Sequence, residues 1–194
     1  MIDIRSKKCI VCNVISASKK YKNHCYRCFI HTFPDNQIVR NHKTKERSVS
    51  DFVKDTFPNY DWRFDKTITY GCSRRRPDIF CDFGSHCLII EIDENQHTTY
   101  DSTCENKRLM ELFTDVGNRP IVIIRFNPDS YKDELGKRVN SCWKVTKCKG
   151  LLSLLNTNDW SIRLDKLRDT INISMNIAFK EVTIINLYYD YEYK

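Results

Sequence analysis

Two continuous apolar runs, separated by a helical pattern, are the feature that most constrains how this chain of 194 residues can fold. The first run is HCLIIEID at residues 86–93, and the second is PIVIIRF at residues 120–126. Such runs are typical of central strands that are buried on both faces. Between them, residues 101–116 carry apolar side chains at helical spacing. Hydrophobic residues make up 41% of the chain, enough to bury a core, and the order of elements indicates an α/β layer arrangement.

The remaining elements are expected on either side of this unit. Before it, a helix over residues 45–57 ends at Pro58, and strands are expected within WRFDKTITY and RRPDIFCDF. After it, GLLSLL predicts a short helix, residues 160–175 predict a longer helix, and EVTIINLYYDY predicts a last strand.

Near the start of the chain, two C-x-x-C pairs are separated by twelve residues and comprise Cys9, Cys12, Cys25 and Cys28. This spacing predicts a closed structural zinc site with four ligands. A segment so short would take its folding free energy from the metal. His24 and His31 are alternative ligands, but four cysteines leave no vacancy. A set of reduced thiols is the competing interpretation.

The other six cysteines lack C-x-x-C spacing and are expected to be buried or free thiols: Cys72, Cys81, Cys87, Cys104, Cys142 and Cys148. A second metal site that includes Cys142 and Cys148 is the alternative for two of them.

Positive charge is concentrated at the start of the chain. Residues 1–50 hold 11 Lys and Arg against 3 Asp and Glu, whereas the rest of the chain is close to neutral. This asymmetry predicts a basic module over residues 1–40, which would also hold the zinc site, and a near-neutral body over residues 45–194. Residues 32–44 have no clear period and many turn formers, which predicts a linker. The module would present four basic side chains to nucleic acid: Lys19, Lys20, Lys22 and Arg27. A solvated basic face without a partner is the competing interpretation.

Acidic residues stand near the ends of two expected strands. Asp78 follows Pro77, and Glu91 and Asp93 lie two positions apart, so their side chains point to the same face. If the two strands pair antiparallel through a turn at residues 83–86, Asp78 comes close to Glu91. Clustered carboxylates repel one another unless a cation neutralises them, and oxygen ligands suit Mg²⁺ or Mn²⁺. The pattern predicts a metal site for phosphoryl chemistry, with a solvated surface turn as the alternative.

Four motifs, in this order, carry a resemblance to a known family: RRPDI, EIDENQH, CENKRL and IIRFNPD. Over residues 45–131 the chain resembles the PD-(D/E)XK nuclease superfamily, in the branch related to the very-short-patch-repair endonuclease and certain homing endonucleases. The cysteine-rich start is similar to a zinc module fused to such nucleases in large DNA viruses and some protists. The resemblance implies a restriction-endonuclease-like mixed β-sheet flanked by helices, with a small N-terminal zinc module.

The resemblance also implies which residues hold the catalytic metal. Asp78 and Glu91 match the two acids of the family and would ligate Mg²⁺ or Mn²⁺. The backbone carbonyl of Ile92 would be a further ligand. Glu46, on the first helix, matches an acid that reaches a second metal through water.

Three further catalytic candidates follow from the same resemblance. Asp93 occupies the position of the family's lysine, which departs from the usual motif. His97 therefore becomes the candidate base or water-positioning group, because an imidazole with a pKa near 6.5 can accept a proton. Gln96 would assist it.

Basic residues surround these acids in the sequence. Three arginines stand directly before Pro77: Arg74, Arg75 and Arg76. They suit contact with a phosphate backbone, and structural pairing with Asp82 or Glu94 is the alternative. On the following helix, Lys107 and Arg108 would face the scissile phosphate or decorate the surface.

Arg125 stands within a buried strand, where a charge needs a partner. That partner would be a site carboxylate or the phosphate of the substrate. A structural ion pair is the alternative.

The first functional hypothesis is a metal-dependent DNA endonuclease, of homing or repair type, that hydrolyses phosphodiester bonds. The second is a non-catalytic nucleic-acid-binding protein that retains the nuclease fold, and the third is a zinc adaptor for protein partners. DNA is the expected partner, and a homodimer is one open oligomeric state. No apolar run approaches 18 residues, so no membrane partner is expected. The start of the chain lacks a signal-peptide pattern, so the expected location is the cytoplasm, the nucleus or the viral factory of an infected cell.

Overall fold

The computed structural model describes residues 8–13, 16–25, 28, 29, 32, 33, 36, 45–97, 102–145, 152–176 and 180–191. Within these ranges, the side chains of residues 95, 97, 102–104 and 145 are left out of the description. Contacts divide the chain into two compact units, Met1–Lys43 and Thr44–Lys194. None of the helices that the structure describes combines the length and the apolar character needed to cross a membrane.

The N-terminal unit has little regular structure among its described residues. The 3₁₀ helix η1 (Lys19–Tyr21) lies between the two cysteine pairs. Phe29 is fully buried, and its ring centroid lies 5.4 Å from that of Tyr21 and 5.2 Å from that of Phe33. A small aromatic cluster therefore accompanies the cysteines, and it is far smaller than the core of the body.

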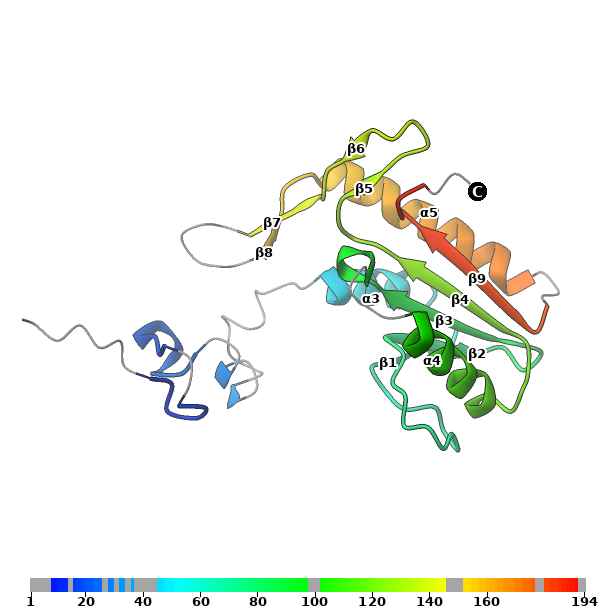
Figure 1. Ribbon diagram of the computed structural model, residues 1–194, viewed down its shortest axis with the longest axis horizontal. Coiled ribbons are helices and arrows are strands. Elements are labelled where there is room, and N and C mark those ends of the chain that lie inside the picture. The colour runs from blue at the N-terminus through cyan, green and yellow to red at the C-terminus, as the bar shows by residue number, and fades with distance from the viewer. Residues whose placement is uncertain are drawn as a thin grey trace, which may run out of the picture. The chain divides into compact units, whose positions relative to one another are not determined.

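The body is a mixed α/β unit built on a five-stranded sheet (Figure 1). In spatial order, the sheet strands are β1 (Arg63–Phe64), β2 (Ile79–Asp82), β3 (Cys87–Ile92), β4 (Ile121–Phe126) and β9 (Val182–Leu187). The helices are α3 (Lys45–Thr56), α4 (Ser102–Asp115), α5 (Thr157–Asn176) and the 3₁₀ helix η2 (Glu94–His97). Two hairpins add β5 (Tyr131–Lys132) with β6 (Arg138–Val139), and β7 (Trp143–Val145) with β8 (Leu152–Leu154).

The sheet changes direction of pairing in its middle. Strands β1, β2 and β3 pair antiparallel, whereas β3, β4 and β9 pair parallel. The β2–β3 hairpin closes where the backbone N–H of Phe83 donates to the carbonyl of His86 at 3.0 Å, as predicted for residues 83–86. Parallel pairs need crossover connections. Helix α4 lies between β3 and β4 in the chain, and α5 lies between β4 and β9.

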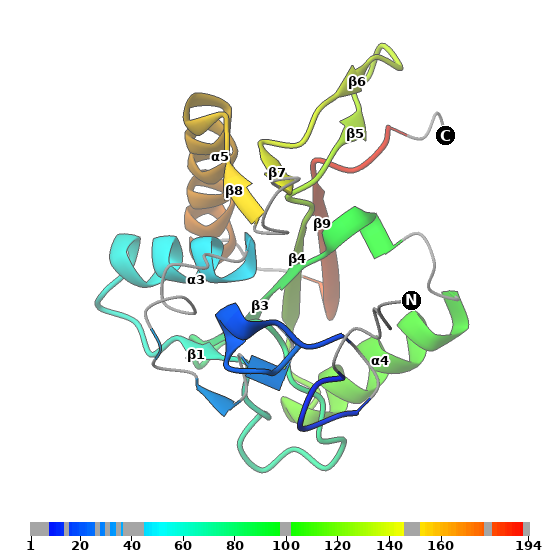
Figure 2. The same cartoon turned by 90° about the vertical axis from the view of Figure 1, so that its left-hand side faces the viewer.

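Helices cover both faces of the sheet, α3 and α5 on one side and α4 on the other (Figure 2). Strand residues alternate between the two sides. On β3, Leu88 and Ile90 pack with the α3–α5 layer, and Cys87 and Ile89 pack with the α4 layer. Every residue of β3 is buried, which explains the continuous apolar run in the sequence.

Three predictions of secondary structure need correction. GLLSLL does not form the expected short helix, because Leu152–Leu154 forms strand β8, paired with β7. Within WRFDKTITY only Arg63–Phe64 is a strand. The helix expected over residues 160–175 begins at Thr157, because the Asn156 side chain caps it by accepting a hydrogen bond from the backbone N–H of Asp159 at 3.1 Å. The linker expected within residues 32–44 lies mostly outside the described residues.

Candidate functional site

The four cysteines predicted to bind zinc lie together. Their Sγ atoms are all within 4.8 Å of one another, and those of Cys12 and Cys25 are 3.9 Å apart. A tetrahedral zinc ion with bonds of about 2.3 Å separates its sulfur ligands by about 3.8 Å, so the arrangement fits this ion. Cys9 and Cys25 are buried, and the backbone N–H of Cys28 donates to Cys25 Sγ at 3.4 Å. The cluster is a site that could hold zinc.

The thiols of this cluster differ in how readily they lose a proton. The hydrogen bond with Cys25 and burial raise the pKa of Cys28 to about 12. Although burial opposes the shift, hydrogen bonds from the backbone, first that of Cys12, lower the pKa of Cys9 to about 6. The sulfurs therefore do not all ionise by themselves, and a divalent cation would stabilise the thiolates together. His24 is not part of the four-residue cluster, and its Nδ1 lies 2.8 Å from the carbonyl oxygen of Lys22.

The basic side chains of the N-terminal unit are exposed at Lys19, Lys20 and Lys22. Two of them lie over aromatic rings: Lys20 Nζ is 5.3 Å from the ring centroid of Tyr21, and Lys22 Nζ is 4.4 Å from that of Phe33. Arg27 lies outside the described residues. These lysines with adjacent rings form a surface that suits phosphate and base contacts.

In the body, the predicted acids gather on the α4 face of the sheet. Glu91 follows Cys87 and Ile89 on this face of β3, and Asp78 stands directly before β2. The Asp78 carboxylate accepts a hydrogen bond from the backbone N–H of Ile92 at 2.7 Å. Because the N–H and C=O of one strand residue point to the same neighbouring strand, the Ile92 carbonyl also faces the side of Asp78. Two carboxylates and one carbonyl are thus brought to one end of the sheet.

Glu91 is buried and pairs with a basic residue from the helix above it. Arg108 Nη2 donates to Glu91 Oε1 at 2.6 Å. Burial still dominates, and with the charge of Asp78 it raises the pKa of Glu91 to about 7, while Arg108 opposes the shift. Burial also raises the pKa of Asp78, against the lowering effect of the Ile92 N–H. Both carboxylates are therefore held in surroundings that disfavour their charge and would be relieved by a cation.

Asp93 is only 1% exposed. Its carboxylate accepts hydrogen bonds from Arg125 Nε and from the hydroxyl of Tyr189. Arg125 Nη2 forms a second ion pair with Glu105 Oε1 at 2.6 Å. Arg125 therefore has ion-pair partners, as expected of a charge within a strand, and Asp93 holds it in place; these contacts fit both a site carboxylate and a structural ion pair. Sequence reasoning missed Tyr189 and Glu105, which lie on other elements.

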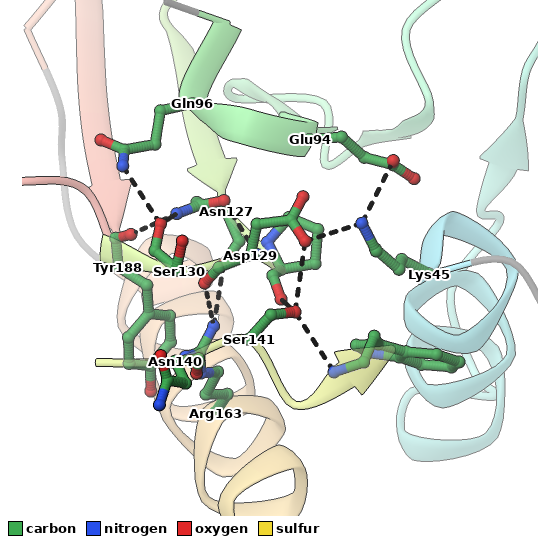
Figure 3. Close-up of polar contacts among 12 residues, drawn as sticks. Lys45, Glu94, Gln96, Asn127, Asp129, Ser130, Asn140, Ser141, Arg163 and Tyr188 are labelled. Atoms are coloured by element: carbon green, nitrogen blue, oxygen red, sulfur yellow. Dashed lines mark hydrogen bonds and ion pairs between the residues drawn. The ribbon is translucent and has the colours of Figure 1, made fainter. Parts of the chain in front are cut away.

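Glu46 lies in the first turn of α3, next to a buried lysine. Lys45 Nζ is 2.7 Å from Asp129 Oδ1 and 3.2 Å from Glu94 Oε2 (Figure 3). Lys45 and Asp129 are 7% and 8% exposed. Burial, and then the charge of Asp78, raise the pKa of Glu46. The ion pair fixes the start of α3 beside the carboxylates.

The same cluster ties down the segment after β4. Arg163 of α5 is 3% exposed and donates from Nη1 to the carbonyl of Asp129 at 2.8 Å and from Nη2 to that of Asn140 at 3.1 Å (Figure 3). Asn127 Nδ2 donates to the carbonyl of Tyr188 at 2.7 Å. The FNPD motif thus anchors the carboxyl ends of β4 and β9 to α3 and α5.

The remaining predicted catalytic residues lie in η2. Gln96 exchanges two hydrogen bonds with Asp190, each 2.9 Å long, one to the carboxylate and one from the backbone N–H. This places Gln96 against the segment after β9 and away from the lining of the carboxylate cavity. His97 is the last residue of η2, and its side chain lies outside the described part of the chain.

The arginines before Pro77 are held by α4 and by the β1 loop. Arg75 Nε donates to Glu111 Oε2 at 2.5 Å, and Arg76 Nη2 lies 2.9 Å from Asp65 Oδ2. The alternative partners, Asp82 and Glu94, are instead paired with Arg119 and Lys45. Arg74 is exposed.

Gly71 is required by the close approach of this loop to α4. A Cβ at position 71 would lie 2.7 Å from Asp115 Cγ. The Asp115 carboxylate accepts hydrogen bonds from the backbone N–H groups of Cys72 at 2.8 Å and Ser73 at 3.0 Å. The loop is thereby fixed before it reaches the arginines.

Asp78, Glu91 and Asp93 line a cavity of about 650 Å³. Its acidic residues are Glu46, Asp78, Glu91, Asp93, Glu94 and Glu105, and its basic residues are Arg75, Arg76, Lys107, Arg108 and Arg125. Among the residues that the structure describes, only the cysteine cluster brings three or more potential ligand atoms within 4.8 Å of one another. The carboxylates are thus gathered in one cavity without being closed into a cage.

The other cysteines form no second cluster within the described ranges. Cys81, Cys87 and Cys142 are buried, and burial raises the pKa of each thiol. Cys72 is exposed. The side chain of Cys104 and all of Cys148 lie outside the described part, so the second metal site stays an untested alternative.

Comparison of this chain with protein-family models, with curated proteins and with solved structures finds no match in any of the three. The class that the fold and the two sites define is a mixed α/β protein with a four-cysteine cluster at its start.

Proposed function

We propose that the protein is a metal-dependent endonuclease that hydrolyses phosphodiester bonds in DNA. The observation that carries the proposal is that Asp78, directly before β2, and Glu91 of the adjacent strand β3 line one cavity, with the Ile92 N–H bonded to Asp78. Open α/β sheets bind ligands beyond the carboxyl ends of their parallel strands, and the cavity lies at that end. The resemblance to the PD-(D/E)XK superfamily points to the same residues.

The donor set suits a hard divalent cation. Asp78, Glu91 and the carbonyl of Ile92 supply oxygen ligands, which Mg²⁺ and Mn²⁺ prefer. Burial raises the pKa of both carboxylates, so a nearby cation would lower their free energy. Six acidic and five basic side chains line the cavity. A phosphate that entered without a cation would therefore bring negative charge to a site that already has one acid in excess. Such an ion, when bound, supplies charge stabilisation and an activated water.

The basic residues of the cavity would bind and orient the phosphate. Arg125 is held by Asp93 and Glu105, so its guanidinium is preorganised at one wall. Arg108 pairs with Glu91, and this pair would open as Glu91 turns to a cation, which frees Arg108 for a phosphate oxygen. Glu46, held by the anchored start of α3, would orient water from the opposite side. Asp93 is a positioning residue in this scheme, because its oxygens are already engaged.

The N-terminal unit would supply affinity for the DNA backbone. Structural zinc would fold it, and the exposed lysines at 19, 20 and 22 would contact phosphates. The location that fits this function is a compartment of the cell, or of an infected host, where DNA is present.

A second candidate function is DNA binding without catalysis. It is favoured by the Arg108–Glu91 ion pair, which occupies a proposed metal ligand, and by the absence of a carboxylate cage among the described residues. If Arg108 neutralised Glu91 permanently, the site would be stable but would not bind the catalytic metal.

The test is cleavage of supercoiled plasmid with Mg²⁺ or Mn²⁺ by the wild type and by Asp78→Asn. We expect the variant to lose at least about 100-fold in rate, the scale of losing one electrostatic stabiliser of a transition state. Binding to a labelled duplex in Ca²⁺ should be retained, because removing a carboxylate also removes repulsion of phosphate. The matched control is Asp82→Asn on the same hairpin, whose carboxylate pairs with Arg119 outside the cavity.

Absence of cleavage by the wild type with either metal, together with intact duplex binding, would favour the non-catalytic alternative. Cleavage of RNA but not of DNA would change the substrate class and leave the site in place. Equal loss of binding and cleavage in Asp78→Asn, with a lowered melting temperature, would mean that Asp78 holds the fold.

A further inference from the structure

A second cavity lies beside the carboxylate site and is not used by the proposed chemistry. Its volume is about 880 Å³, and four tyrosines contribute to its lining: Tyr131, Tyr188, Tyr189 and Tyr191. Tyr131 belongs to β5, and the other three follow β9 directly. Large amphipathic rings of this kind provide surfaces on which a planar group can stack.

Two of the tyrosine rings, those of Tyr131 and Tyr188, are held in place by a cation and by each other. The buried guanidinium of Arg163 lies 5.1 Å from the ring centroid of Tyr131 and 5.0 Å from that of Tyr188. These two rings contact each other edge to face, with centroids 5.5 Å apart. Tyr191 is 52% exposed, and its backbone N–H donates to the carbonyl of Lys132 at 3.2 Å. The cavity is therefore a formed site with one exposed ring at its rim.

Residues that line the two cavities are paired with one another in the sheet. In the register of the parallel strands, Glu91 pairs with Arg125, and Arg125 pairs with Asn186. Glu91 and Arg125 line the carboxylate cavity, and Asn186 lines the tyrosine cavity. Two strand spacings of about 4.8 Å separate the backbones of Glu91 and Asn186. Tyr189 joins the sites a second time, because its hydroxyl donates to Asp93.

The charge of the second cavity is opposite to what a phosphate needs. The lining contains one basic residue, Lys132, and three acids, Asp133, Glu134 and Asp190. A phosphate would be repelled, whereas a neutral planar ring with N–H donors on its edge would meet carboxylate and amide acceptors. The amide side chain of Asn186 adds a donor and an acceptor to the same wall, whereas that of Gln96 is already hydrogen-bonded to Asp190 and to the carbonyl of Ser130.

We propose that the tyrosine cavity binds an unpaired nucleobase of the DNA strand whose phosphate lies in the carboxylate cavity. The phosphate belongs to the arginine-lined side and the base to the tyrosine-lined side, about two strands away. The base would stack on Tyr191 at the rim, with the rings held by Arg163 behind it. This inference rests on the proposed function for the identity of the strand, but the binding it describes does not require cleavage.

The test measures affinity for single-stranded DNA 12-mers in Ca²⁺, each with one abasic nucleotide at a different position, by fluorescence anisotropy. Loss of one stacked base typically costs on the order of 10-fold in affinity. We expect one position at which removing the base weakens the wild type by about that factor and weakens Tyr191→Ala by less than about 2-fold. Tyr191→Phe keeps the ring and should behave as the wild type. Tyr70→Ala is the matched control, because Tyr70 is 98% exposed and lines neither cavity.

The outcomes separate this inference from the proposed function. If the protein cuts DNA but no abasic position distinguishes the wild type from Tyr191→Ala, the base site is wrong and the nuclease stands. If such a position exists without any cleavage, the base site stands and the nuclease is wrong. Tight binding of free deoxyadenosine monophosphate that does not compete with the 12-mer would also overturn the assignment, because the ligand would then be a free nucleotide.

Discussion

The two units of the chain stabilise their clustered ionisable side chains in different ways. The N-terminal unit places four sulfurs within 4.8 Å of one another and has only a small aromatic cluster, so a cation would be the centre of its fold. The body has a sheet covered on both faces, and its acids are held by arginines, a lysine and a tyrosine. A metal would hold the first unit together, whereas it would be a ligand of a body that is already folded.

The largest effect expected from this comparison is the response to metal removal. Chelation should unfold the N-terminal unit, because structural zinc contributes about 10 kcal/mol or more of apparent free energy in such small units. The body should keep its melting temperature. Elemental analysis, with limited proteolysis before and after chelation, measures both units, and Cys25→Ser should mimic chelation while Cys72→Ser should not. Equal protease resistance of the N-terminal unit with and without metal would contradict the comparison.

The second effect concerns the buried ion pair of the body. Asp129→Asn leaves Lys45 with a weakened partner at 7% exposure, and breaking such a pair costs about 3–5 kcal/mol. Denaturant titration of the body's unfolding measures this loss. The double variant Lys45→Met with Asp129→Leu should recover most of the stability, because it leaves no unpaired buried charge: Glu94, which also loses Lys45, is 49% exposed and stays solvated. A double variant as unstable as Asp129→Asn would mean that packing, and not charge, determines the cost.

The third effect is a pH dependence of the metal-free body. The pKa of Glu91 is raised to about 7 from 4.5, so the folded state keeps a proton that the unfolded state releases. The stabilisation is fully present below pH 4.5 and is lost as the pH rises to about 7, by about 3 kcal/mol at most. Melting in EDTA across this window measures the slope. Glu91→Gln should flatten it, and an unchanged slope in that variant would assign the proton to another group.

The sequence predicted those features of the body that depend on residues close to one another along the chain. The strands β2, β3 and β4 and the approach of Asp78 to Glu91 follow from local pattern and one short turn, and the structure confirms them. The helix expected at GLLSLL is wrong, because the three residues of β8, Leu152, Ser153 and Leu154, are too few to show a period and only pairing with β7 decides their conformation. The nuclease assignment itself stays a proposal.

The contacts that hold the site join residues far apart in the sequence, so local pattern could not predict them. Tyr189 lies 96 positions from Asp93, and Asp129 lies 84 positions from Lys45. One signal was present in the sequence, because Lys45 stands on the same helical stripe as Val49 and Val53, which are fully buried. A charge on an apolar stripe needs a partner, but only the folded sheet identifies which acid provides it.

The smallest effect is expected at the exposed counterpart of the buried pair. Arg119 contacts Asp82 through two hydrogen bonds of 2.8 and 2.7 Å, so its geometry is as good as that of Lys45 with Asp129. The side chains of Arg119 and Asp82 are 36% and 42% exposed. Exposed ion pairs contribute about 1 kcal/mol or less to the free energy of unfolding. The hydrogen bond from Arg119 lowers the pKa of Asp82 to about 2, so this contribution is present above about pH 4 and is lost as the pH falls through 2. Denaturant titration of Asp82→Asn at pH 7 should show that small loss, and at pH 2 to 3 the difference from the wild type should shrink. A loss as large as that of Asp129→Asn would show that geometry, and not burial, sets the cost of breaking an ion pair in this body.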